Sequence, residues 1–218
     1  MDIGKLSLRE RKFARTKLAL LNAAVARMMD RSYEAISVRE LCDEAMVSEA
    51  TFFNYFPKKS DLLVYFVELW AIDVAWHGRH DSDGAGGLAA IEAIYNRTAV
   101  RASTRPRVMN EIIAFIAREQ EEAAFKTVSA AERLMAYPDL EQVESLPDET
   151  FDSLVNRNLE IAVRKGELPA TADLEQTRVL LQSVFFGVPL VLGIGRAGEV
   201  GTTYRNMLNL IWKGIRSS

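Results

Sequence analysis

The apolar positions of this chain recur at steps of three and four residues, which is the spacing of one face of an α-helix. The pattern predicts an amphipathic first helix over about residues 8–30, with an apolar face that includes Phe13, Leu20, Ala24 and Met28. No alternating pattern of strand length and no internal repeat occurs. The sequence therefore predicts an all-α fold.

Two short helices are predicted next. Ser37 and Glu40 have the spacing of a capping box, in which the serine hydroxyl and the glutamate carboxylate each accept a free backbone N–H, so a helix is expected over residues 38–45. Ser48 is a second N-cap residue and predicts a helix over residues 49–55. Pro57 ends it, because the residue before a proline is forced out of the α conformation.

A long helix is expected from near Lys58 to Trp76. It is apolar on most faces, so it has to be buried on more than one side and joins two packed bodies. We place the domain boundary at its start, with residues 1–57 as the small domain and residues 58–218 as the larger one. After a glycine-rich linker at 81–87, further helices are predicted over residues 88–103, 106–122, 124–137, 148–165 and 173–192, and along a last helix that carries Tyr204, Leu208, Ile211 and Ile215.

Composition is that of a soluble globular protein: 49% of the 218 residues are hydrophobic and 26% are charged. A single cysteine, Cys42, excludes an internal disulfide framework and a multi-cysteine zinc site, and suits a reduced thiol. The first ten residues lack the apolar core of a signal peptide. The longest apolar run, 179–194, is interrupted and shorter than the roughly 20 residues of a membrane-spanning helix. We expect a cytoplasmic protein with no membrane partner.

Charge is distributed unevenly along the chain. Residues 1–60 hold 11 Lys and Arg against 8 Asp and Glu, whereas residues 61–218 carry a net charge of −6. The basic residues crowd into positions 5–17, where Glu10 is the one acid. This asymmetry indicates that the amino-terminal end faces a polyanion. The alternative is a solvated basic helix end.

The two short helices and the turn between them, Met46-Val47-Ser48, have the spacing of a helix-turn-helix. In that motif the amino-terminal residues of the second helix meet base edges in the major groove of DNA. A carboxylate there accepts from cytosine N4, and a methyl group contacts the thymine methyl. The residues in that position are Ser48, Glu49, Ala50 and Thr51. A helical hairpin without a DNA role is the alternative.

The run from Thr51 to Leu63, TFFNYFPKKSDLL, resembles the TetR family of bacterial repressors, as do the capping box and the turn before it. The resemblance covers about residues 13–63. This chain departs from the family pattern at Ser32 and Met46, where glycine is usual, and at Phe53, where many members carry a phosphate-binding tyrosine.

The resemblance implies a homodimer that binds an operator in double-stranded DNA. Base or groove contacts would come from Arg39, Glu49, Ala50 and Thr51, and phosphate contacts from Ser48, Asn54, Tyr55 and Lys59. The basic arm before Phe13 would reach neighbouring phosphates or the minor groove. We expect the core of the small domain to contain Phe13, Leu41, Val47, Phe52 and Phe56.

In TetR relatives the remaining two thirds hold a ligand pocket and the dimer interface. Because such pockets are mostly apolar with a few polar groups, Tyr95 and Asn110 are the favoured anchors for an unknown small-molecule effector. The alternative for each candidate is plain helix packing. The full set of candidates is Trp70, Tyr95, Met109, Asn110, Phe115 and Phe151.

The helix over residues 179–192 is apolar around most of its circumference, so one subunit cannot easily cover it. Together with the last helix it predicts a four-helix interface about a two-fold axis. Packing within one subunit is the alternative. The predicted interface residues are Leu181, Phe185, Phe186, Leu208, Ile211 and Ile215.

Catalysis is not expected, because no nucleophilic triad and no phosphate-binding loop occurs. His77 and His80 form the only histidine cluster, and their place at a helix end favours solvation over metal binding. We predict a transcriptional repressor with no cofactor, no metal and no catalytic residues, released from a pseudo-palindromic operator by an apolar or amphipathic ligand. The alternatives are a helical small-molecule binding protein without a DNA role, an activator and a ligand-independent regulator.

Overall fold

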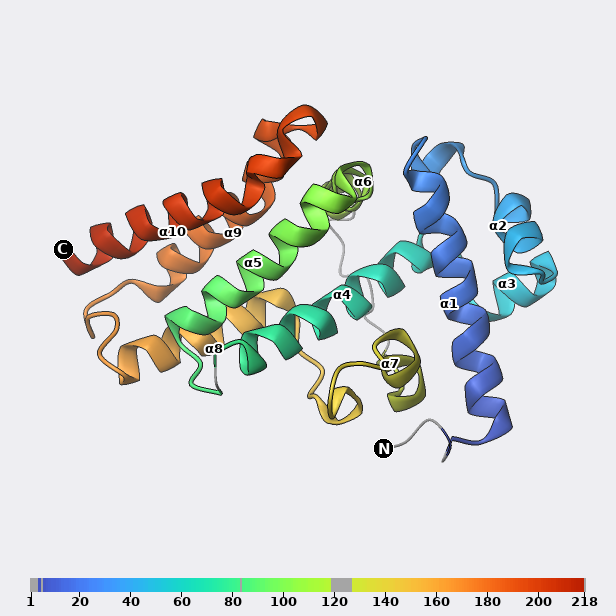
Figure 1. Cartoon of the computed structure of the whole chain (residues 1–218), viewed down its shortest axis with the longest axis horizontal. Coiled ribbons are helices and arrows are strands. Elements are labelled where there is room, and N and C mark those ends of the chain that lie inside the picture. The colour runs from blue at the N-terminus through green and yellow to red at the C-terminus, as the bar shows by residue number, and fades with distance from the viewer. Residues whose placement is uncertain (1–3, 5, 83, 119–126, 218) are drawn as a thin grey trace. The chain divides into compact units, whose positions relative to one another are not determined.

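The computed structural model describes residues 4, 6–82, 84–118 and 127–217, and over these residues the chain is helical without a strand (Figure 1). The all-α prediction is therefore confirmed. Lys5 of the basic cluster and positions 119–126 of two predicted helices lie outside the described residues. The helices are α1 (Leu8–Met28), η2 (Tyr33–Ala35), α2 (Val38–Ala45), α3 (Glu49–Tyr55), α4 (Asp61–His80), α5 (Leu88–Thr104), α6 (Pro106–Arg118), α7 (Ala130–Ala136), η3 (Val143–Ser145), α8 (Phe151–Arg164), α9 (Leu174–Leu192), η4 (Ile194–Glu199) and α10 (Val200–Ser217).

Helix starts follow the local capping chemistry. The capping box predicted for α2 is present: Glu40 N–H donates to Ser37 Oγ at 3.2 Å, and Ser37 N–H donates to the Glu40 carboxylate at 2.8 Å. α4 begins at Asp61, later than the predicted Lys58. The intervening residues form a turn with bonds from residue i+3 to residue i, such as Asp61 N–H to Lys58 O at 3.1 Å, before the regular α pattern starts.

The chain forms two compact units, each made of two stretches of sequence. Unit 1 consists of residues 1–72 and 111–148, and unit 2 of residues 73–110 and 149–218. α4 and α6 each contribute residues to both units, in agreement with the prediction that the long helix joins two packed bodies. The sequence boundary at 57/58 separates proposed functions rather than compact units, and it stays a prediction. No described helix combines the length and the apolar content needed to span a bilayer.

In unit 1, α1 packs against α2 and α7. The predicted core residues Leu41, Phe52 and Phe56 are buried, and Val47 is half-buried. Phe13 is not a core residue, contrary to the prediction, since 42% of it is exposed. Its ring rests edge-on against Tyr55, with centroids 4.8 Å apart, at the outer side of α1.

A buried ion pair ties α1 to α7. Lys17 Nζ lies 2.5 Å from Glu132 Oε1, and only 2% of the Glu132 side chain is exposed. The same ammonium lies 3.9 Å above the Tyr65 ring, a distance at which the ring face attracts a cation. Burial by itself raises the pKa of Glu132, but hydrogen bonds from Lys17 and Ser129 outweigh it and leave the pKa below its usual value.

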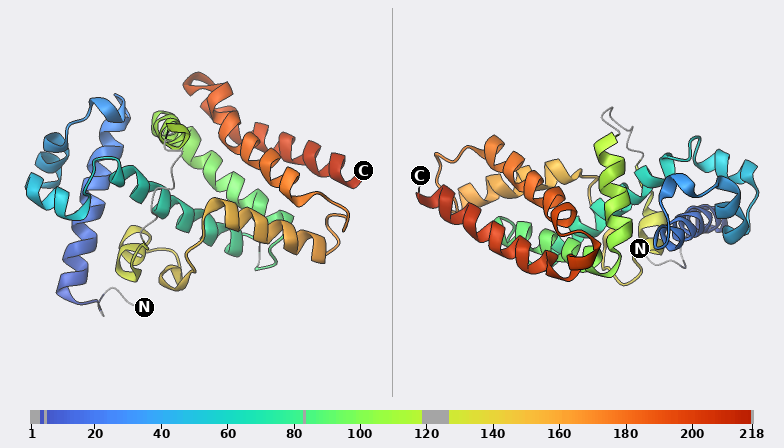
Figure 2. Two further views of the ribbon diagram at one scale, coloured as in Figure 1. Left: turned by 180° about the vertical axis from the view of Figure 1, so that it is seen from behind. Right: turned by 90° about the horizontal axis from the view of Figure 1, so that it is seen from above.

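In unit 2, α10 packs against α5 and α9, and α8 against α5 and α9; Figure 2 shows these helices side by side from two directions. Tyr95 and Tyr204 are buried between them, and each hydroxyl donates to a carbonyl of α9, Leu181 O at 2.7 Å and Phe185 O at 2.5 Å. Because both hydroxyls have acceptors, these tyrosines fill the core without leaving a buried donor unpaired.

Asp73 of α4 carries the buried charge of unit 2. Its carboxylate accepts two hydrogen bonds of 2.8 Å from Arg97 and one of 2.9 Å from Arg101. Burial raises the pKa of Asp73, yet the two guanidinium groups outweigh burial and hold the pKa below its usual value. The carboxylate therefore stays ionised and links α4 to α5.

Candidate functional site

The turn between α2 and α3 has the helix-turn-helix form, with a methionine in its sharpest position. Met46 has φ 54° and ψ 46°, in the left-handed region, and 90% of the residue is exposed. Met46 N–H donates to Asp43 O at 3.3 Å, and Val47 N–H donates to Cys42 O at 3.0 Å. A non-glycine residue in this conformation costs roughly 1–2 kcal/mol, so the rest of the motif offsets that strain.

The first turn of α3 is fixed by its own side chains. Thr51 N–H donates to Ser48 Oγ at 3.1 Å, and the two hydroxyl oxygens lie 2.9 Å apart. Phe52 is fully buried and anchors the helix in unit 1. The exposed residues of α3 are Glu49, Ala50, Phe53 and Asn54, which share one face of the helix.

Other residues predicted to touch DNA lie in different settings. Arg39 is exposed on the first turn of α2, and Tyr55 is half-buried against Phe13. Lys59 Nζ donates to Tyr33 O at 2.6 Å and to Glu34 O at 3.2 Å, above the Tyr33 ring. Burial lowers the pKa of Lys59, although Glu34 opposes that effect. In this arrangement the ammonium holds η2 on the start of α4 and is not directed to solvent.

The basic cluster near the amino terminus presents exposed cations. Arg9, Arg11, Lys12 and Arg15 are all exposed on the first two turns of α1. Lys17 is different, since it belongs to the ion pair with Glu132 described above. The start of α1 is held by a capping box, in which the Ser7 N–H and hydroxyl donate to the carboxylate of Glu10, the one acid of this region.

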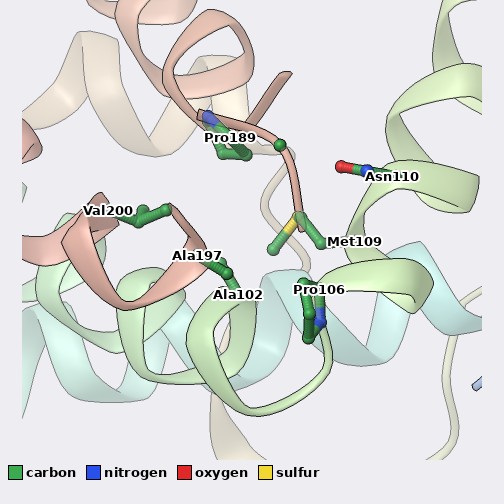
Figure 3. Close-up of a pocket in the computed structure, with 8 residues that line it drawn as sticks. Ala102, Pro106, Met109, Asn110, Pro189, Ala197 and Val200 are labelled. Atoms are coloured by element: carbon green, nitrogen blue, oxygen red, sulfur yellow. The ribbon is translucent and has the colours of Figure 1, made fainter. Parts of the chain in front are cut away.

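Unit 2 contains a small apolar hollow, partly open to solvent (Figure 3). It lies where the end of α5 and the first turn of α6 meet the end of α9 and η4. Two predicted ligand residues, Met109 and Asn110, line it, and the Asn110 amide is the one polar side chain in the lining. The lining residues are Ala102, Pro106, Met109, Asn110, Pro189, Gly193, Ala197 and Val200.

The other predicted ligand residues do not line this hollow. Tyr95 is part of the packed core of unit 2, and the Phe151 ring lies 4.3 Å from the Phe185 ring. Trp70 and Phe115 belong to unit 1, where Phe115 is buried and Trp70 half-buried. The sequence analysis did not predict that residues of α9 and η4 line the hollow. The available signal was Gly193, which ends α9 with φ 62° and makes a sharp turn there.

The predicted interface residues divide by burial. Leu181, Phe185, Leu208 and Ile211 are buried in the core of unit 2, so their side chains already pack within one subunit. Phe186 and Ile215 are half-buried. The exposed apolar residues of the same region are Val179, Leu180, Leu190 and Val191 on α9, Ile194 on η4, and Met207 and Leu210 on α10; we call this set the α9–α10 face.

The histidines at the end of α4 bond locally. His77 Nδ1 lies 2.9 Å from the Asp81 carboxylate, and the His80 ring stacks on Trp76 with centroids 3.8 Å apart. Among the residues that the structure describes, no group of three or more His, Cys, Asp or Glu is arranged to hold a metal ion.

Comparison with known proteins gives a family match for the amino-terminal segment and the fold of nearly the whole chain. Residues 20–66 match the family model described as bacterial regulatory proteins, tetR family. That segment contains α2, the turn and α3, together with the last part of α1 and the start of α4. No curated protein sequence matches the chain.

Similar solved structures span nearly the whole chain. Thermus thermophilus FadR, a TetR family transcriptional repressor in complex with lauroyl-CoA, is 17% identical with a TM-score of 0.59, over 91% of this chain and 94% of that one. Salmonella enterica GusR is 16% identical with a TM-score of 0.59, over 93% and 96%. The ketosteroid transcriptional regulator KstR2 of Mycobacterium tuberculosis is 16% identical with a TM-score of 0.52, over 99% and 98%. Residues 20–66 therefore match the tetR family of bacterial regulatory proteins, and nearly the whole chain shares the fold of these solved structures.

Proposed function

We propose that this protein is a homodimeric transcriptional repressor that a small apolar or amphipathic ligand releases from a pseudo-palindromic operator. The observation that carries the proposal is the exposed face of α3, on a capped helix whose opposite side is anchored by buried Phe52. A helix presented in this way fits the major groove, where residues of its first turn meet base edges.

The contacts in this proposal divide by chemistry. Arg39, Glu49, Ala50 and Thr51 are assigned to base edges, and Ser48, Asn54 and Tyr55 to phosphates. The exposed cations of α1 add sequence-independent attraction, which makes affinity fall with salt. Lys59 is assigned to supporting η2, because its ammonium already has two carbonyl acceptors.

Dimerisation is assigned to the α9–α10 face. Its exposed leucine, valine, isoleucine and methionine side chains form an apolar surface on neighbouring helices, which a second copy can cover by the same surface. A two-fold dimer would present two copies of α3 to half-sites separated by one turn of DNA or a multiple of it.

The hollow of unit 2 is assigned to the effector. The enclosed space of the hollow is about that of one water molecule, with the Asn110 amide in its lining. Drug-sized ligands fill roughly 300–1,000 Å³, so the helices around the hollow would have to move apart to admit an effector. Lauroyl-CoA, held by the FadR structure, is an amphipathic molecule of this general kind.

α6 is the proposed connection between ligand and DNA. Its first turn lines the hollow, and the next residue, Glu111, accepts a 2.9 Å hydrogen bond from Tyr33 N–H. Arg118 further along α6 pairs with Glu34. A ligand that favours a different position of α6 would therefore move η2 and the helices that follow it. Release requires different ligand affinities for the two conformations.

Gel-shift titration tests the proposal, with DNA flanking the coding region and an unrelated duplex of equal length. We expect selective binding of the flanking DNA as a dimer, and release by an apolar ligand that also raises the melting temperature, because the coupling is reciprocal. Equal affinity for both duplexes at all salt concentrations would contradict sequence-specific regulation. A ligand that raises the melting temperature without changing the gel shift would contradict ligand release.

A further inference from the structure

The exposed face of α3 carries an aromatic ring without a polar group, that of Phe53. Phe53 is 47% exposed, whereas Phe52 and Phe56 on the same helix and its cap are 0% and 3% exposed. The hydrophobic effect accounts for the two buried rings, since burial of a phenylalanine stabilises a fold by roughly 1.5–3 kcal/mol. It does not account for an exposed ring on this face.

The ring of Phe53 has a defined position. Its edge meets the ring of Phe52, with centroids 5.3 Å apart and planes at 79°, an arrangement that aromatic pairs favour. Phe53 follows Glu49 by four residues and Ala50 by three, so all three project from one side of the helix. A groove that receives Glu49 and Ala50 therefore also receives Phe53.

The major groove offers one apolar partner to such a ring. Among the base edges exposed there, thymine alone carries a methyl group, and apolar side chains contact it. Phenylalanine has no hydroxyl with which to bind a phosphate, so a polar contact to the DNA backbone is excluded for this side chain.

We propose that Phe53 is a specificity-determining residue that reads the 5-methyl group of a thymine in the operator half-site. The inference rests on the proposed function, because it requires that α3 enter the major groove. It assigns to this chain an apolar contact in addition to the polar base contacts of its helix-turn-helix.

The test begins with selection of binding duplexes from a random DNA library by the full-length protein. Each thymine of the selected site is then replaced singly by deoxyuridine, which removes only the methyl group. For wild-type protein we expect affinity to fall about fourfold at one thymine of each half-site, the factor that corresponds to one buried methyl group.

The decisive variant is Phe53→Ala, measured on the thymine and deoxyuridine duplexes as a double-mutant cycle. We expect the variant to bind both duplexes equally, at about the affinity of wild-type protein for the deoxyuridine site or below it. Asn54→Ala is the matched control, because it alters the neighbouring exposed residue, and it should weaken both duplexes by the same factor. Circular dichroism melting of each variant checks that the domain is folded.

Two results would overturn the inference and leave the proposed function intact. One is wild-type binding that is insensitive to deoxyuridine at every position. The other is a methyl dependence that persists in Phe53→Ala, which would assign the contact to another residue such as Ala50. If the wild-type protein selected no sequence from the library, the proposed function would fail together with the inference.

Discussion

The α2–α3 region and the core of unit 2 are held together over very different distances in sequence. Ser37 and Ser48 each bond to a backbone N–H three residues ahead. In unit 2, Tyr95 bonds to Leu181 and Gly87 to Asn158, which are 86 and 71 residues away. The α2–α3 region is thus specified by local chemistry, whereas unit 2 depends on packing between distant helices.

This difference predicts how each region responds to mutation. Local caps and turns contribute about 1 kcal/mol each, and their loss affects one helix end. Buried long-range contacts involve several elements, so their loss affects a whole unit. The following experiments test that contrast, from the largest expected effect to the smallest.

Asp73→Ala should be the most destabilising of these changes, by about 3–5 kcal/mol, because it removes the buried carboxylate that accepts all three guanidinium hydrogen bonds from Arg97 and Arg101. Here it would leave Arg97 and Arg101 facing the place of a lost carboxylate. Chemical denaturation measures the free energy of unfolding. The matched control is Asp81→Ala, an exposed carboxylate directly after α4, where a loss above about 1 kcal/mol would contradict the contrast.

Leu190→Glu should separate the subunits, because a charge would then lie in the α9–α10 face. Loss of two-site binding should weaken operator affinity by about 100-fold or more. Light scattering reports the mass, and gel shifts report the affinity. Glu175→Gln, an exposed change near the start of α9, is the control that should remain dimeric. A dimeric Leu190→Glu variant would place the interface elsewhere.

Acid should weaken unit 1 through Glu132. Its pKa is lower in the folded chain than in the unfolded one. The contribution of Glu132 to the free energy of unfolding is therefore complete at a pH above its unfolded pKa, and it is lost as the pH falls through its folded pKa. The pH window of this loss therefore lies below 4.5, the ordinary pKa of a glutamate side chain. Glu132→Gln should reduce the fall of the melting temperature as the pH decreases below about 5. An unchanged pH dependence of the melting temperature would contradict the assignment of this effect to Glu132.

Met46→Gly should stabilise the protein by about 1 kcal/mol, since glycine adopts the left-handed conformation without strain. Gln142→Gly is a matched comparison, because Gln142 also has a positive φ, of 56°, and lies away from α3. Both should raise the melting temperature. If Met46→Gly lowered it, the exposed methionine would have a stabilising contact that outweighs its backbone strain.

The local region was the more predictable one. The capping box at Ser37, the N-cap at Ser48 and the buried Leu41, Phe52 and Phe56 follow from patterns only a few residues long. The prediction that Phe13 is a core residue was wrong, because this residue lies near the start of α1, where its ring contacts Tyr55 and stays 42% exposed.

Patterns in unit 2 were less informative for a physical reason. α9 is apolar around most of its circumference, so its sequence does not distinguish the inner face, with Leu181 and Phe185, from the outer one, with Leu180 and Val191. The hollow was equally difficult to predict from the sequence. Its lining combines Met109 and Asn110 with Pro189 and Gly193, which lie about 80 residues later in the chain. Short sequence patterns do not predict contacts between residues so far apart.

The discontinuity of unit 1 limits how regulators of this kind can be recombined. A chimera that joined residues 1–72 to the body of another protein would omit residues 111–148. Lys17 would then keep its aromatic neighbours but lose Glu132, and Tyr33 N–H would lose Glu111. A functional graft of this DNA-reading module should therefore carry both stretches of sequence, or supply a carboxylate at each of the two positions.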